Sequence, residues 1–200
     1  MRILDTSKAG FTLVELVIVI VMIGILVVPA YTFFNTSFSQ YISLQKSGSG
    51  LSDLTMQSQR VATVLRGVTG IITATNDSID CYAYFAPSDA YVSRIVYYKN
   101  SSKTKLFADV TRMTSNPPIG TEIADSKHTY TIINNFFEAS GAKTFTYLDD
   151  TGNTLATPIA DLKTIKSIKV TLFVPDGNLS KDSKQSISVQ VSLRNRKTNL

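Results

Sequence analysis

The chain has 200 residues, a formal net charge of +5, and only one cysteine and one histidine. This length leaves room for an N-terminal membrane anchor and one further domain with its own core. The single Cys81 excludes an intrachain disulfide, and its apolar neighbours predict a buried thiol. His128 has no second histidine or cysteine at metal-ligand spacing, and the sequence has no nucleotide-binding loop. We therefore expect no metal, no cofactor and no enzyme activity.

Residues 11–34 form an apolar segment whose only charged residue is Glu15. As a helix this segment would be about 36 Å long, which is enough to cross a bilayer. A charge inside a bilayer costs roughly 3 kcal/mol on insertion scales, so Glu15 is predicted to be functional. Arg2 and Lys8 precede the segment and no positive charge follows until Lys46. This asymmetry predicts a cytoplasmic N-terminus and an external C-terminal region.

The residues at the start of this segment form a recognisable pattern. A short basic leader ends in Gly10, and Phe11, then Glu15, and a long apolar run follow. The pattern resembles the processing site of type IV prepilins and pseudopilins. The resemblance implies that a membrane prepilin peptidase removes residues 1–10 and methylates the new amino group of Phe11. It also implies a mature protein in the cytoplasmic membrane that joins an external or periplasmic filament.

The charge of Glu15 has a physical explanation in such a filament. A subunit that joins must bury its charged Phe11 amine among the helices of its neighbours, and Glu15 of an adjacent subunit can pair with that amine. Only one axial stagger brings the two groups together. The expected partners are the peptidase, other pilin or pseudopilin subunits, the inner-membrane assembly platform and the lipid bilayer. The alternative is a single-pass anchor with an acidic residue near the membrane surface.

Apolar side chains continue at helical spacing beyond the membrane segment, from Phe34 to Val68. The stripe keeps its phase across Gly48 and Gly50, although each glycine costs a helix about 1 kcal/mol relative to alanine. This predicts one helix over residues 11–66, with 35–68 as its extracytoplasmic part. The alternative is two helices joined by a flexible linker at the glycines.

After Gly67 the pattern changes to the alternation typical of strands. Strands are predicted at residues 79–85, 91–98, 105–110, 129–137, 144–148, 165–174 and 186–193, with a short helical turn at 160–163. A helix followed by antiparallel strands predicts an α+β fold of the pilin kind, in which the helix packs on the β ectodomain of residues 69–200.

Parts of this ectodomain also resemble the minor pseudopilin J and minor pilin W group. The similar segments are residues 94–98, 145–153, 165–174 and 191–195. The chain lacks the cysteine pairs of a typical major pilin. The resemblance thus implies a minor, low-copy subunit, while the sequence leaves open whether the machine is a pilus, a secretion system or a DNA-uptake system.

Two polar segments allow more than one interpretation. Residues 149–153 (Asp-Asp-Thr-Gly-Asn) could bind calcium, but they lack the spaced carboxylates of an EF-hand loop and favour a solvated turn. The basic segment 181–200 could bind anionic lipid or DNA, as in a membrane-tethered binding module at a filament tip. It also fits a strand edge protected by lysines.

Overall fold

The computed structural model describes residue 10 and residues 12–136, 141–175 and 184–194. The chain divides into two compact units, which are residues 1–45 and residues 46–200. Helix α1 (Leu13–Arg66) contributes to both units. The remaining elements all belong to the second unit. They are β1 (Gly70–Ala74), β2 (Ile79–Ala83), β3 (Ser93–Lys99), β4 (Leu106–Arg112), β5 (His128–Ile133), β6 (Phe145–Leu148), the 3-10 turn η1 (Leu162–Thr164), β7 (Ser167–Pro175) and β8 (Lys184–Ser192).

Helix α1 runs without a break through Gly48 and Gly50. The prediction of one helix is confirmed over Leu13–Arg66, and the alternative of two helices with a linker is wrong. The reason lies in the turns that follow the glycines, where Leu54, Val61 and Leu65 are completely buried or nearly so. Each such side chain contributes about 1.5–3 kcal/mol when buried, which offsets the cost of the two glycines.

Strands β1 to β5 form an antiparallel sheet in the order β1-β2-β3-β4-β5. Each strand pairs with the next one along the chain, which makes the sheet a meander. Strand β1 is an addition to the sequence prediction. It pairs with β2 through a register shift between Ile71 and Thr73, so its side chains do not alternate cleanly. The other seven strands were predicted, with ends that differ by a few residues.

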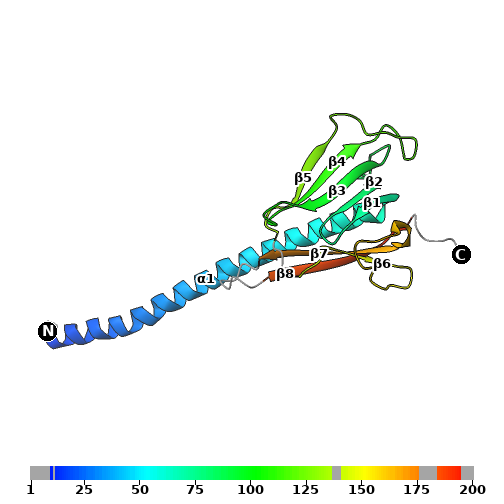
Figure 1. Ribbon diagram of the computed structural model, residues 1–200. Coiled ribbons are helices and arrows are strands. Elements are labelled where there is room, and N and C mark those ends of the chain that lie inside the picture. Colours follow the sequence, from blue (N-terminus) through cyan, green and yellow to red (C-terminus); the bar gives the residue numbers. More distant parts are fainter. Residues whose placement is uncertain (1–9, 11, 137–140, 176–183, 195–200) are drawn as a thin grey trace, which may run out of the picture. The chain divides into compact units, whose positions relative to one another are not determined.

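Strands β6, β7 and β8 form a second antiparallel sheet, in that order. In the second unit, the C-terminal part of α1 lies between the two sheets (Figure 1). One hydrophobic core joins the helix and both sheets. The Tyr97 and Phe145 rings, one from each sheet, are in contact, and the Tyr147 hydroxyl donates to the carbonyl of Thr75 at 2.9 Å. The predicted α+β architecture is confirmed.

Cys81 lies at the centre of this core, on β2, with no exposed surface. Burial raises the pKa of its thiol, because the thiolate would lose its hydration. The prediction of a buried thiol is confirmed.

Strand β8 is an edge strand, as the sequence suggested, but lysines do not protect the edge along its length. Residues 185–192 carry no charge. The basic residues stand at its ends instead, with Lys184 at its first position and Arg194 two residues beyond its last, while 181, 196 and 197 lie outside the described residues. Alternation of Ile187, Val189 and Val191 explains the strand, because these side chains face one side.

The outer face of the first sheet carries a network of ion pairs. Arg94 on β3 donates from Nη2 and Nε to the carboxylate of Asp80 at 2.7–3.2 Å and from Nη1 to Glu122 at 2.7 Å. These hydrogen bonds, first of all those to Asp80, raise the pKa of the guanidinium. Glu122 belongs to the long segment between β4 and β5, so Arg94 ties that segment to β2 and β3.

A second ion pair joins Lys127 to Asp109 at 2.7 Å, and Asp109 also accepts from Thr129 at 2.6 Å. Burial pushes the pKa of Asp109 upward, but the hydrogen bonds from Lys127 and Thr129 outweigh burial and leave this pKa below its usual value. A carboxylate with a depressed pKa contributes stability above its unfolded-state pKa, and that contribution is lost as the pH falls through the folded-state value.

We expect Arg94→Met to lower the free energy of unfolding by about 1–3 kcal/mol, because it leaves Asp80, whose side chain is only 10% exposed, without its charged partner. The measurement is a denaturant titration of the full chain in detergent, followed by circular dichroism. Lys105→Met is the control, because Lys105 is exposed and has no ion-pair partner in the described part of the chain. Equal midpoints for the two variants would contradict a stabilising role for the network.

Candidate processing and assembly site

The first turn of α1 holds Glu15 in a specific arrangement. Thr12 directly precedes the first helical residue, and its Oγ1 accepts a hydrogen bond from the backbone N–H of Glu15 at 3.3 Å. In return, Glu15 Oε2 accepts from the backbone N–H and the hydroxyl of Thr12, both at 3.4 Å. This reciprocal pattern is a capping box. The sequence carries the signal for it, Thr-x-x-Glu ahead of an apolar run.

These hydrogen bonds are long, so the cap holds Glu15 loosely. In the described part of the chain, Glu15 has no partner other than Thr12, and its side chain lies on the surface. The next basic residue on the C-terminal side, Lys46, is roughly 46 Å away along a helix at 1.5 Å per residue. In a chain without residues 1–10, no basic side chain of the same helix could reach Glu15. A positive partner must then be an amino terminus or come from another molecule.

Gly10 lies outside the helix and is exposed. A Cβ built on Gly10 would meet no atom of the described residues within 4 Å, so packing within the described part of the chain does not require a glycine at this position. Any requirement for glycine must come from a protein that binds this segment. Phe11, the second predicted processing residue, lies outside the described residues.

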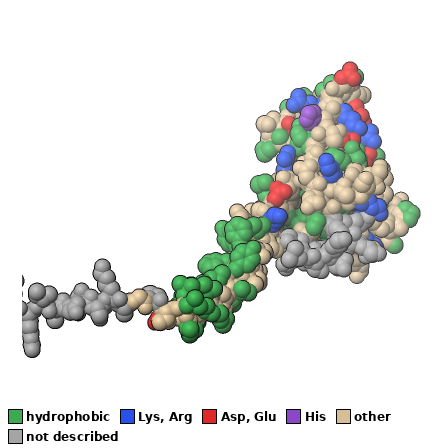
Figure 2. Space-filling model, turned by 90° about the vertical axis from the view of Figure 1, so that its left-hand side faces the viewer, with side chains coloured by type: hydrophobic (Ala, Val, Ile, Leu, Met, Phe, Trp, Pro, Cys, Tyr) green, Lys and Arg blue, Asp and Glu red, His purple; other side chains and the backbone are tan. Residues whose placement is uncertain are grey.

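The side chains that follow Glu15 form an apolar surface. Every residue from Leu13 to Phe34 is exposed, with an exposed fraction of 80% for Leu13 and 71% for Phe34. Figure 2 shows hydrophobic side chains gathered along this part of the helix. By length and composition, α1 is the one helix in the described chain that could cross a membrane, with a mean hydropathy of 2.9 in its most apolar window. Such a surface needs lipid or other helices around it.

Pro29 lies inside α1 and does not end it. Proline has no N–H, so one backbone carbonyl in the preceding turn loses its helical partner. The carbonyl affected is that of Ile25, four residues before the proline. The Thr32 hydroxyl donates to the carbonyl of Pro29 itself at 2.9 Å, so this bond lies one turn beyond that position. Membrane helices commonly tolerate prolines.

Residues 5–31 match the family model described as the prokaryotic N-terminal methylation motif. The match covers the second half of the leader with Gly10, then Phe11, Glu15 and most of the apolar part of α1. Together with the single long helix packed on antiparallel sheets, this match supports the resemblance of the chain to the type IV prepilin and pseudopilin superfamily. The motif implies processing by a prepilin peptidase and assembly with other pilin-like proteins. No curated protein and no solved structure shows significant similarity to the chain.

The other polar candidates from the sequence lie far from α1 in the chain and serve local structure. Asp149 Oδ1 accepts hydrogen bonds from the backbone N–H groups of Thr151 and Asn153 and from the Thr151 hydroxyl, at 2.8–3.0 Å. These bonds, first that of the Thr151 hydroxyl, lower the pKa of Asp149. Gly152 has a φ of 87°, which closes the turn. The segment is a solvated turn, and the described residues contain no group of three potential metal ligands.

His128 lies at the start of β5 with its ring against Tyr130, at a centroid distance of 4.6 Å. Of the basic residues proposed to bind DNA, Arg194 follows β8, whereas Arg196 and Lys197 lie outside the described residues. DNA binding by this segment stays a prediction.

Proposed function

We propose that this chain is a minor pilin or pseudopilin, a structural subunit of a type IV pilus or of a type II secretion-like filament. The observation that carries the proposal is the methylation motif leading into an exposed apolar helix whose first turn holds the lone acid Glu15. In this proposal a prepilin peptidase cuts between Gly10 and Phe11 and methylates the Phe11 amine. The chain spans the cytoplasmic membrane once, with its C-terminal region outside, before it joins the filament.

Assembly in this proposal uses the two ends of α1 differently. Residues 11–34 pass from lipid into a bundle formed with the helices of other subunits, and Glu15 pairs there with a methylated amine. The last turns of α1 are already buried against the sheets of the same chain through Leu54, Val61 and Leu65. They therefore belong to the ectodomain core and are not available to other subunits. The lack of a cysteine pair and the length of the ectodomain support a minor rather than a major subunit.

The proposal is tested by mass spectrometry of the protein from its natural host. We expect a mature N-terminus at Phe11 that carries one methyl group. When the peptidase gene is deleted, we expect the uncleaved precursor, which keeps residues 1–10. Sheared surface filaments or cross-linked membrane assemblies should contain the mature form. A protein that keeps residues 1–10 in the presence of the peptidase would refute the processing step, and its absence from every filament fraction would refute the structural role.

A further inference from the structure

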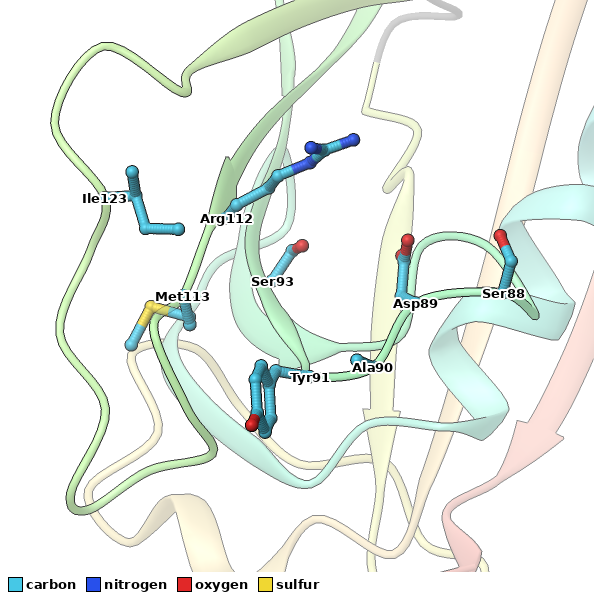
Figure 3. A pocket seen from close by; sticks show the side chains of 8 residues that line it. All are labelled: Ser88, Asp89, Ala90, Tyr91, Ser93, Arg112, Met113 and Ile123. Atoms are coloured by element: carbon cyan, nitrogen blue, oxygen red, sulfur yellow. The ribbon is translucent and has the colours of Figure 1, made fainter.

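The ectodomain has a hollow of about 350 Å³ at the end of the first sheet where β3 begins and β4 ends. Figure 3 shows its wall, with Ser93 and Arg112 on neighbouring strands, Met113 and Ile123 on one side, and Ser88 and Asp89 on the loop opposite. The volume lies at the lower end of the range for small-molecule sites, so it suits one compact ligand unit.

Two hydrogen bonds hold the loop that forms one side of the hollow. The backbone N–H of Ala86 donates to Asp89 Oδ2 at 2.8 Å, and the N–H of Val92 donates to Asn116 Oδ1 at 3.0 Å. On the opposite side, a Cβ at Gly120 would overlap the backbone carbonyl of Ser115, so this segment is built around a glycine. The hollow is therefore a formed part of the fold.

Ser93 is the most enclosed polar residue that lines the hollow. It is 3% exposed, and the Ser93 side chain faces the hollow (Figure 3). Its hydroxyl bonds to no described side chain, and its oxygen is not sealed from solvent, so it can bond to whatever fills the hollow. That is water when the hollow is empty of ligand, and a ligand hydroxyl or carboxylate can take the place of that water.

Arg112 stands directly beside Ser93. The two residues are opposite each other in the pairing of β3 with β4, so their side chains leave the same face of the sheet. Arg94, the chain neighbour of Ser93, points to the other face and binds two carboxylates. Arg112 has no carboxylate within salt-bridge distance in the described chain, and its guanidinium extends over the hollow (Figure 3). A planar guanidinium with free donors matches a carboxylate.

The remaining groups narrow the ligand class. The Asp89 carboxylate faces the same hollow as Arg112 (Figure 3), so a ligand must present one negative group to Arg112 and uncharged hydroxyl groups to Asp89. Asp89, Ser88 and Ser93 are suited to hydroxyl groups, and Tyr91 offers an aromatic ring that is half exposed. Arg112 also lines a second hollow of about 250 Å³ with His128 and Tyr130, which gives room for a neighbouring unit.

We propose that this hollow is a binding site for a carboxylated sugar, such as a uronic acid unit of an acidic polysaccharide. Arg112 binds the carboxylate, the Ser93 hydroxyl bonds to the same unit, and Asp89 accepts hydrogen bonds from ring hydroxyls. The site would let the ectodomain contact acidic glycans, and it is independent of how α1 is processed or assembled.

The test uses the full chain in detergent with D-glucuronate as the probe and D-glucose as its neutral counterpart, followed by ligand-observed NMR and calorimetry. We expect glucuronate to bind at least tenfold more tightly than glucose. Arg112→Gln should weaken glucuronate about tenfold or more, because it removes a charge-assisted bidentate contact. Ser93→Ala should weaken it several-fold. Lys105→Gln, which removes an equal charge at an exposed site outside the hollow, should have no effect.

Several results would overturn the proposal. These are no binding of glucuronate, equal losses for Arg112→Gln and Lys105→Gln, or equal binding of glucose. Equal or tighter binding of a blocked diglutamate peptide would assign the site to acidic peptides and reject the sugar. Circular dichroism of each variant confirms that the ectodomain is folded, and a Ser93→Ala variant that is folded but binds normally would also count against the site.

Discussion

Replacing Gly10 with valine is expected to leave the chain as an uncleaved precursor in the membrane. A side chain at position 10 would meet no described atom within 4 Å, so the substitution does not disturb the described fold. It does place a branched side chain at the bond that the peptidase must bring into its active site. A steric penalty of about 3 kcal/mol in that transition state corresponds to a rate about a hundredfold lower. The measurement is the ratio of precursor to mature protein in the natural host, by mass spectrometry and immunoblot.

The matched control is Gly24→Val. Gly24 also has open space around a built Cβ, but it lies inside the apolar helix α1, beyond the leader and the bond that is cut. Cleavage of this variant should be normal. A Gly10→Val protein that matures to Phe11 as fast as the Gly24→Val protein would contradict the assignment of Gly10 to the processing site.

The sequence predicted the elements whose pattern is local. Helix α1 follows from the apolar run and the helical spacing beyond it, and strands such as β3 and β7 follow from regular alternation. The sequence pattern did not predict strand β1, because this strand is only five residues long, begins with Gly70 and has a register shift between Ile71 and Thr73. A short strand of this kind depends on its partner β2 and has little pattern of its own.

The features that the sequence did not predict join residues that are distant along the chain. Arg94 meets Asp80 and Glu122, which are 14 and 28 residues away from it. Ser93 and Arg112 share a face only because of the exact register of β3 on β4. A one-residue shift of that register would place Arg112 on the outer face, so no pattern within one strand could reveal the pair.

The helix start shows the opposite case, in which a local signal was available. Thr12 and Glu15 are three residues apart, and this spacing alone indicates a capping box. The cap gives Glu15 a role inside its own chain in addition to the proposed role between subunits. The two roles require different properties of the side chain, since the cap needs an acceptor oxygen and the pairing with an amine needs a negative charge.

Glu15→Gln separates the two roles, because the amide keeps an oxygen for Thr12 and loses the charge. We expect Glu15→Gln to be cleaved normally but to enter filaments about a hundredfold less than the natural chain. The reason is that a buried amine without its counter-charge costs about 3 kcal/mol in the bilayer. The measurement is the amount of the variant in sheared or cross-linked filament fractions, relative to the amount in the membrane. Glu15→Leu, which also lacks the charge, should show the same loss of incorporation as Glu15→Gln.

Thr12→Val is the control for the cap. It removes the hydroxyl from the capping box and keeps the Glu15 charge, so it should weaken the first helical turn by about 1 kcal/mol. Incorporation should then remain within several-fold of the natural chain. If Thr12→Val and Glu15→Gln lost incorporation equally, or if Glu15→Gln assembled normally, the carboxylate would act on the helix start alone. The pairing of Glu15 with the amine of another subunit would then have to be abandoned.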